Sequence, residues 1–403
     1  MRAGLQHASG TLRMKVVIAS RIFTPEPAAA SFRLSALATA LSSHGAAVTV
    51  LTTRALGGAS ASDPKMRVSR WPVLRNREGQ VRGYLQYLSF DIPLFFRLLF
   101  SRGVDGVVVE PPPTTGTVVR VVCAVKRIPY IYYAADVWSD AAAATGVPRI
   151  VELLLRSVER FAFRGATLVL AVSDGIADRI RELAPNVDIK VVKNGVDTAV
   201  FHPGVAERSR RPTAVYAGTM SEWQGAEIFL AALPQVLERV PDARLVFIGS
   251  GSARPEIERL AAELGIGAVE ILATLQPPLA AQWLRSARVA LVSLKPGQGY
   301  DFAIPTKIFA AAATGTPVLF SGTGPSADLV KKHALGQAVA YELSAVSAAM
   351  SAMLERAPTL ESDQRISRWA EHNVSISRTG AQASGLVVET LSRCRQISTV
   401  CEH

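Results

Sequence analysis

Cysteine is scarce in this sequence. Only Cys123, Cys394 and Cys401 occur among 403 residues, and their spacing fits no metal-binding motif. Such a sparse and odd set argues against a disulfide framework and favours a reducing compartment. The chain also lacks the sequence D-x-D, so paired aspartates at that spacing are not available to hold a metal ion. We therefore expect no metal site.

Long hydrophobic runs are missing as well. No apolar run reaches the roughly 18 residues that a membrane-spanning helix needs. The opening segment, MRAGLQHASGTLR, lacks the apolar core of a signal peptide. We therefore expect a flexible tail over residues 1–13 and a cytoplasmic protein.

Acidic residues are outnumbered by basic ones. The chain has 33 Asp and Glu against 44 Lys and Arg, a net charge of +11. Such an excess predicts an anionic partner, which can be nucleic acid, an acidic membrane surface or a phosphorylated substrate. No recognisable nucleic-acid-binding module is visible, so we expect no nucleic-acid partner.

Arginines and aromatic residues are mixed between residues 66 and 102. Several arginines precede the stretch YLQYLSFDIPLFFRLLFSR. This composition is typical of a segment that lies in a bilayer interface, so we expect contact with an anionic membrane surface through residues 66–102. A helix packed on its own domain, with a break at Pro93, would have the same composition.

Hydrophobic residues are plentiful, at 49% of the chain, and they occur in short continuous runs. KVVIA (15–19), a helical segment ending at Gly45 and AVTVLTT (47–53) form a βαβ unit, because such runs are typical of parallel strands buried on both faces. Further strands are expected at 105–110, 129–136, 166–173 and 189–197. A second series follows at 213–219, 244–251, 288–294 and 317–322, with a helix at 224–239.

The two series predict an α/β protein with two Rossmann-like, doubly wound parallel-sheet domains that face each other across a cleft. Pro, Gly and charged residues at 201–211 indicate a linker. We expect an N-terminal acceptor-binding domain at 14–200 and a C-terminal nucleotide-binding domain at 201–375. A C-terminal helix at 376–403 is expected to pack back on the N-terminal domain.

Three stretches of the second half are candidates for phosphate contact. In YAGTMSEWQG (216–225), a strand ends at Gly218 and a polar loop precedes a helix, an arrangement whose amides can hold an anion. In IGSGS, Gly249 and Gly251 permit close backbone approach. A plain structural turn would explain either stretch.

The third stretch is IPTKIFAAAATGTPVLF (304–320). Pro305 suits a helix start, and Thr306 and Lys307 then lie at the positive end of the helix dipole. A lysine there costs a few tenths to about 1 kcal/mol, whereas a charge-assisted hydrogen bond to a diphosphate contributes roughly 1.5–3 kcal/mol. The balance favours a bound phosphate, with a lysine extended into solvent as the alternative.

The first half offers candidates for the other substrate. SRIFTPEPAAASFR (20–33) joins the first strand to its helix, and its three alanines would allow close approach. A simple surface loop is the alternative. Asp136 follows the apolar strand YIYYAA and precedes Val137 and Trp138, so it is expected in the cleft; a helix N-cap is the alternative.

Seven stretches in this order resemble the GT4 family of glycosyltransferases with the GT-B fold. They are TPEPAAASFR, VVVEPPPTTG, ADVWSD, KNGVDTAVF, YAGTMSEWQG, FIGSGS and IPTKIFAAAATGTPVLFSG. The resemblance covers nearly the whole chain, from about residue 14 onward. It is closest to the branch that acts on lipid-linked precursors of bacterial surface polysaccharides.

The resemblance implies retaining, metal-independent transfer of a hexosyl or N-acetylhexosaminyl group from a nucleotide diphosphate, with a UDP-sugar as the expected donor and no cofactor. Asp136 and Lys307 are the implied catalytic residues. Ala29, Ala30 and Arg33 match the acceptor loop. The implied donor-binding residues are Gly218, Thr219, Gln224, Gly249, Gly251, Pro305, Thr306 and Lys307. The implied acceptor is lipid-linked or another glycan, on the inner face of the cell membrane.

Three positions depart from the family pattern. Phe302 and Ala310 stand where many relatives carry two glutamates, the later of which usually binds the ribose. Gln224 stands where many members have a phosphate-binding lysine, and Ala29 and Ala30 replace glycines. A non-catalytic, membrane-bound relative in an assembly complex is therefore the alternative. A dinucleotide-dependent enzyme would need the full glycine fingerprint, which the chain lacks.

Overall fold

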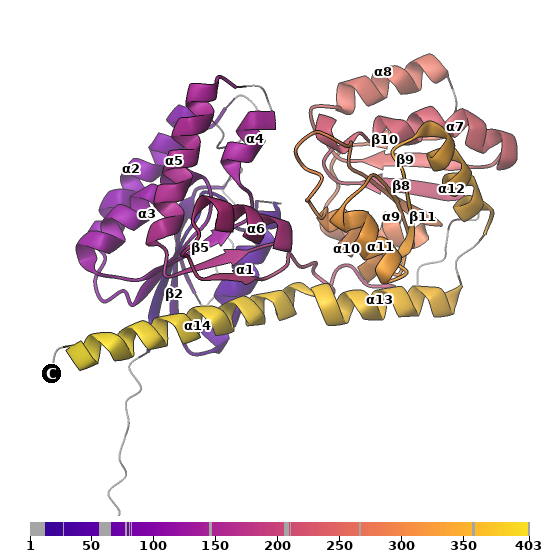
Figure 1. Cartoon of the computed structure of the whole chain (residues 1–403). Helices are drawn as coiled ribbons and strands as arrows, with labels where there is room; N and C mark the ends of the chain where they lie inside the picture. The colour runs from indigo at the N-terminus through magenta and orange to yellow at the C-terminus, as the bar shows by residue number, and fades with distance from the viewer. Residues whose placement is uncertain are drawn as a thin grey trace, which may run out of the picture.

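The computed structural model of the chain describes residues 13–26, 28–55, 66–76, 79, 81, 83–144, 147–204, 209, 211–265, 267–356 and 359–401. Two parallel β-sheets, one in each half of the chain, lie side by side with helices around them (Figure 1). The predicted α/β class with two doubly wound domains is confirmed. The expected tail lies outside the described residues except for Arg13.

The N-terminal sheet has seven parallel strands in the order β3-β2-β1-β4-β5-β6-β7. The strands are β1 (Lys15–Ala19), β2 (Ala47–Thr53), β3 (Arg67–Trp71), β4 (Gly106–Val109), β5 (Tyr130–Ala134), β6 (Leu168–Ala171) and β7 (Ile189–Val191). The helices are α1 (Ala29–Ser43), α2 (Tyr84–Leu99), α3 (Pro113–Lys126), α4 (Trp138–Ala144), α5 (Arg149–Gly165) and α6 (Asp174–Leu183). The central strands are apolar throughout because helices cover both faces of the sheet.

The C-terminal sheet repeats this winding with six parallel strands, in the order β10-β9-β8-β11-β12-β13. The strands are β8 (Thr213–Ala217), β9 (Arg244–Ile248), β10 (Val269–Leu272), β11 (Val289–Ser293), β12 (Val318–Ser321) and β13 (Gly336–Val339). The helical elements are the 3-10 turn η2 (Glu222–Gln224) and the helices α7 (Glu227–Arg239), α8 (Arg254–Leu264), α9 (Pro277–Ser286), α10 (Thr306–Ala313), α11 (Pro325–Lys332) and α12 (Leu343–Glu355).

Two consecutive helices connect the halves along one side of the molecule. Figure 1 shows α13 (Leu360–Val374) below the C-terminal half and α14 (Ile376–Cys401) below the N-terminal half. α14 packs against α1, where the His44 imidazole lies 2.7 Å from the Ser384 hydroxyl. A Cβ on Gly380 would lie 2.8 Å from the Ala36 carbonyl oxygen, so the close approach of the two helices requires glycine there.

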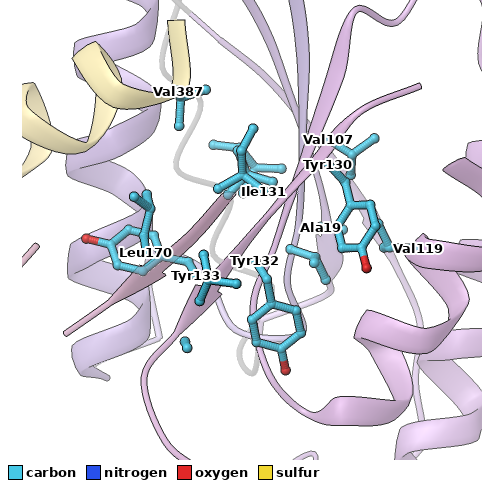
Figure 2. Close-up of a cluster of buried hydrophobic side chains, with 14 of the residues drawn as sticks. Ala19, Val107, Val119, Tyr130, Ile131, Tyr132, Tyr133, Leu170 and Val387 are labelled. Atoms are coloured by element: carbon cyan, nitrogen blue, oxygen red, sulfur yellow. The ribbon is translucent and has the colours of Figure 1, made fainter. Parts of the chain in front are cut away.

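The core of the N-terminal half gathers around β5. Tyr132 and Tyr133 are almost fully buried within it. Val387 of α14 belongs to the same buried cluster, as Figure 2 shows. Since α14 also contributes Ala383 and Leu391, the C-terminal helix is part of the N-terminal hydrophobic core.

Some local predictions are wrong. α2 runs through Pro93 without the break considered above, because packing of its buried side outweighs the one backbone hydrogen bond that proline removes. The helix expected at 224–239 begins at Glu227, after the turn η2. Ala29 and Ala30 form the first turn of α1 rather than a loop. Among the described helices, none is both long and apolar enough to span a bilayer.

Candidate functional site

A cleft of about 1260 Å³ lies between the two sheets. On the N-terminal side, the residues that follow β1, β5 and β6 line it, among them Arg21, Asp136 and Ser173. On the C-terminal side, Trp223 and Ile304 contribute to its wall. The cleft thus lies at the carboxyl ends of parallel strands, where open α/β sheets bind their ligands.

Lys307 joins the start of α10 to the loop after β8. Its Nζ donates to the Tyr216 hydroxyl (2.8 Å), the Thr219 carbonyl (2.7 Å) and the Gln224 Oε1 (2.8 Å). The ammonium also lies 4.4 Å from the centroid of the Tyr216 ring. The alternative of a lysine extended into solvent is therefore wrong. Lys307 thus contacts three residues, Tyr216, Thr219 and Gln224, of the stretch 216–225 that the sequence analysis selected.

Electrostatics at Lys307 act in two directions. Burial lowers the pKa of its amino group well below the ordinary value of 10.5. In general, oxygen acceptors and an aromatic ring around an ammonium favour its charged form. An anion placed at this point would favour the charged form further, so the site gains most from a ligand with negative charge.

Gly218 makes room for the lysine. Its φ is +128°, and a Cβ at this position would lie 2.6 Å from Cε of Lys307. Thr219 follows in the same loop and supplies only its carbonyl to the lysine. A side chain at Gly218 would therefore displace Lys307.

Gln224 fixes the shape of the loop. Its side chain is 6% exposed, and its Oε1 accepts from the Tyr216 hydroxyl at 2.8 Å as well as from Lys307. Together with Ser221 it forms a capping box around η2. The glutamine thus serves as an acceptor for Lys307, where a second lysine would repel it.

Gly249 and Gly251 form the second glycine loop, after β9. Their φ values are +142° and +151°, and Cβ atoms there would lie 2.1 Å from the Gly218 carbonyl oxygen and 2.2 Å from that of Met220. The two loops are also joined by a hydrogen bond from the Met220 amide to the Ser250 carbonyl (2.9 Å). The glycines are needed for this close packing of one loop on the other.

Pro305 and Thr306 begin α10. Pro305 precedes the helix in extended conformation, and Thr306 is its first residue. The first turn holds no acidic side chain. Its amides therefore keep the positive end of the helix dipole available beside Lys307.

Asp136 lies on the opposite side of the cleft, two residues after β5. The side chain is exposed to the cleft, whose walls nevertheless remove enough water to raise the pKa of its carboxyl, while the charge of Arg33 lowers it. The N-cap alternative is not supported, because the Glu159 carboxylate accepts from the amides of Trp138 (2.5 Å) and Ser139 (3.0 Å) at the start of α4.

Arg33 is buried behind the cleft and does not line it. It forms an ion pair with Glu110, donates to the Asn194 Oδ1 at 2.7 Å, and lies 5.0 Å above the Tyr133 ring. Ala29 and Ala30 precede Arg33 in the first turn of α1, and neither lines the cleft.

Sequence reasoning missed several residues of the site. Arg21 lines the N-terminal wall beside Trp138. Trp223 and Tyr300 stack in the C-terminal wall with ring centroids 4.3 Å apart. The available signal for Trp223 was its position within the stretch 216–225, five residues after Gly218. Nothing local marked Glu159, since a glutamate on an amphipathic helix looks like a solvated residue.

Two family descriptions match consecutive parts of the chain. Residues 29–195 match the glycosyl transferase 4-like domain. Residues 211–356 match the glycosyl transferases of group 1. The two matches correspond to the two halves that carry the two sheets.

Curated relatives are similar over part of their length. A D-inositol 3-phosphate glycosyltransferase of Acidothermus cellulolyticus is 32% identical over 34% of this chain and 33% of its own length. A GDP-mannose-dependent α-(1-6)-phosphatidylinositol monomannoside mannosyltransferase of Mycolicibacterium smegmatis is 26% identical over 42% of this chain and 48% of its own. The chain thus spans one third to one half of the length of these relatives.

Solved structures share the whole fold. Sucrose-phosphate synthase from Thermosynechococcus elongatus has a TM-score of 0.77 at 17% identity, covering 94% of this chain and 100% of that one. HepE of Anabaena, crystallised with UDP and glucose, has a TM-score of 0.69 at 16% identity, with coverage of 94% and 100%. The two domain matches confirm the expected family, and the structural likeness confirms the expected fold: the chain belongs to the group 1 glycosyltransferases of the GT4 type and has the GT-B fold.

Proposed function

We propose that the protein is a retaining, metal-independent glycosyltransferase that moves a sugar from a nucleotide diphosphate to a lipid-linked acceptor of cell-surface glycan synthesis. The observation that carries this proposal is the position of Lys307, at the positive end of α10 and against the glycine loop after β8. Asp136 lies in the N-terminal wall of the cleft, whose C-terminal wall includes Trp223 and Ile304, neighbours in sequence of this loop and of the start of α10; Lys307 itself is not among the lining residues.

Breaking the bond between sugar and phosphate places negative charge on the leaving diphosphate. In the proposed mechanism Lys307, the first amides of α10 and the amide of Thr219 stabilise that charge, whereas the Gly218 amide already donates to the Ile248 carbonyl at 2.8 Å. A phosphate oxygen that enters the loop replaces a neutral acceptor of Lys307 by an anionic one, which strengthens the hydrogen bond. The same contact offsets the cost of burying the ammonium.

Asp136 faces the reacting sugar in this proposal. Its carboxylate would orient the acceptor hydroxyl or stabilise positive charge on the sugar ring, while the acceptor proton passes to the leaving phosphate on the same face. Closure of the two halves over the donor would exclude the water that otherwise hydrolyses it.

The donor is proposed to be a UDP-sugar, held without a cofactor. HepE, which has the same fold, was crystallised with UDP-glucose. Other relatives are named as GDP-mannose-dependent, so GDP is the competing nucleotide. Ala310, a half-buried residue of α10, offers no carboxylate to a ribose.

A membrane surface is the proposed location of the acceptor. α2 and α5 expose a set of large apolar side chains, and Figure 1 shows α2 and α3 on the side of the N-terminal half turned away from the C-terminal half. The exposed residues of α2 and α5 are Tyr84, Leu85, Leu88, Ile92, Phe96, Ile150, Leu153, Leu154 and Phe161. Arg149, Arg160 and Arg164 are exposed on α5 as well, and this mix suits peripheral binding to the anionic inner face of a membrane.

A thermal-shift titration with UDP, GDP and their sugars tests the donor site. We expect one nucleotide to raise the melting temperature of the wild type, and Lys307→Met to weaken its binding by roughly tenfold to a hundredfold. Equal shifts in both proteins would remove Lys307 from the site. Nucleotide binding without any hydrolysis or transfer of the sugar would favour the non-catalytic relative instead.

A further inference from the structure

Arg21 occupies an unusual position in the N-terminal wall of the cleft. It follows β1 directly, lines the cleft, and is only 8% exposed. Its Nη1 donates to the Val81 carbonyl at 2.6 Å. Its Nε is buried and has no hydrogen-bond partner among the described residues. A buried guanidinium thus reaches the cleft with donor capacity left over.

Aromatic rings hold this guanidinium in place. Its Cζ lies 4.5 Å from the centroid of the Tyr87 ring and 6.0 Å from that of Trp138. The two rings meet edge to face with centroids 5.7 Å apart. Val151 and Leu155 line the same side of the cleft. A charged group among such walls interacts more strongly with an opposite charge than it would in water.

Two neighbouring arginines form ion pairs, whereas Arg21 does not. Arg33 pairs with Glu110, and Arg75 pairs with Glu26 at 2.6 Å. Among the described residues, Arg21 makes no ion pair. The carboxylate that acts on it most is Asp91 on α2, whose Oδ1 accepts from the Thr115 hydroxyl at 2.6 Å.

Burial lowers the pKa of the Arg21 guanidinium, and Tyr87, which also hydrogen-bonds to it, and Asp91 only partly oppose this. Leaving a buried charge without a partner is costly, and such a group gains stability when a ligand supplies the opposite charge. The planar guanidinium is also suited to bind two oxygens of one anionic group.

We propose that Arg21 binds an anionic oxygen group of the acceptor, a phosphate or a carboxylate, in a pocket formed with Tyr87 and Trp138. The inference rests on the proposed transfer function, which it deepens by naming a charge that the acceptor carries. The pocket belongs to the N-terminal wall, whereas the donor diphosphate is assigned to Lys307 in the other half. The apolar walls favour an anion attached to an apolar chain.

Three short probes test the pocket with the full-length protein. Isothermal titration calorimetry would compare octyl phosphate, octanoate and octanol. We expect at least one anionic probe to bind the wild type more tightly than octanol, and Arg21→Met to weaken that binding by about tenfold or more. The anion that responds more strongly identifies the source of the charge.

UDP binding provides the matched control. Arg21→Met should leave the dissociation constant of UDP unchanged, and Lys307→Met should weaken UDP while leaving the anionic probe unchanged. If the wild type fails to bind any nucleotide, the proposed donor site is wrong, and the result with the three probes still decides about Arg21. Wild-type-like binding of both anions by a folded Arg21→Met protein would overturn the inference, as would equal binding of anions and octanol by the wild type.

A second variant covers the case in which Arg21→Met does not fold. If Arg21 served only to neutralise Asp91, the double variant Arg21→Met/Asp91→Asn would remove both buried charges and keep the acceptor for Thr115. Its melting temperature should be close to that of the wild type. Loss of the anionic probe from this folded double variant supports the inference, and retention of the probe contradicts it.

Discussion

The two halves of the molecule share one topology and differ in their outer surfaces. Each sheet begins at a central strand and winds first to one edge and then to the other. Yet among the described residues, fifteen large apolar side chains are exposed in the N-terminal half and four in the C-terminal half. The winding constrains the strand ends that meet at the cleft, whereas the outer faces of the helices are free to adapt to different partners.

The first loops of the two halves differ in a related way. The loop after β8 carries Gly218, and its basic residue, Lys307, arrives from a distant helix and is fully hydrogen-bonded. The loop after β1 carries its own basic residue, Arg21, with an unpartnered Nε. The equivalent loops of the two halves thus each have a basic side chain beside them, but only in the C-terminal half are all of its donors hydrogen-bonded. We expect the two to serve different ligands, a nucleotide and an acceptor.

The largest effect should come from Asp136→Asn. If the N-terminal half supplies the group beside the reacting sugar and the C-terminal half holds the nucleotide, kcat should fall by about 10²–10⁴-fold. The dissociation constant of UDP should stay the same. Turnover of the nucleotide sugar and calorimetry with UDP measure the two quantities; a parallel loss in both would mean that the halves do not divide the work in this way.

The contrast in exposed apolar surface predicts a membrane effect of roughly a hundredfold. Replacing Leu88, Ile92 and Phe96 by serine removes apolar side chains that would enter the interface, each of which contributes of the order of 1 kcal/mol. Binding to liposomes with anionic lipid should fall accordingly in a flotation assay. High salt should weaken the wild type too, because arginines contribute.

Serine substitutions in the C-terminal half are the control for that experiment. Leu279, Leu343 and Leu360 are exposed large apolar residues of that half. Their triple serine variant should float like the wild type. Equal losses in the two triple variants, or a wild type that stays unbound at low salt, would contradict the membrane assignment.

A smaller effect is expected at Glu159. Its carboxylate accepts hydrogen bonds from the amides of Trp138 and Ser139 at the start of α4. This helix start follows Asp136 closely in the chain. Glu159→Ala should lower the free energy of unfolding by about 1–2 kcal/mol, as loss of a helix cap does. Chemical denaturation measures this change. Glu159→Gln keeps one acceptor and should lose less; an unchanged stability in both variants would show that α4 does not depend on this cap.

The smallest effect concerns the protonation of Asp136. The walls of the cleft favour the neutral acid, so the carboxyl should begin to take up its proton at a higher pH than the ordinary value of 3.8. A ¹³C NMR titration of the carboxyl groups, with Asp136→Asn to assign the resonance, measures the pKa. The active carboxylate form would then be lost on acidification through this raised value. A pKa at or below 3.8 would mean that the charge of Arg33 outweighs desolvation.

Much of the fold could be predicted because its signals are local. The strands at 15–19 and 47–53 were predicted with the boundaries that β1 and β2 have. Parallel strands covered on both faces read as continuous apolar runs, and glycines mark their ends. The course of α2 through Pro93 was harder to predict, because packing against α3 decides it.

The candidate site could be predicted only in part. Lys307, Gly218 and Gln224 were selected separately, each from its own short stretch. Their contact, in which the glutamine accepts a hydrogen bond from the lysine, joins residues more than eighty positions apart in the sequence, so no short stretch could predict it. Arg21 lies in the selected loop 20–33 but was not singled out within it, and Glu159 carried no local mark, since the partners of both come from other elements.

By itself the sequence determined the order of strands and helices, the two halves and the glycines at the ends of the strands, because backbone conformation and burial on both faces depend on neighbouring residues. The tertiary structure alone decided which basic side chains have all their donors hydrogen-bonded, as Lys307 has, and which keep an unpartnered donor, as Arg21 does. That distinction depends on how closely distant segments approach, and on how much water their approach removes from a charged group.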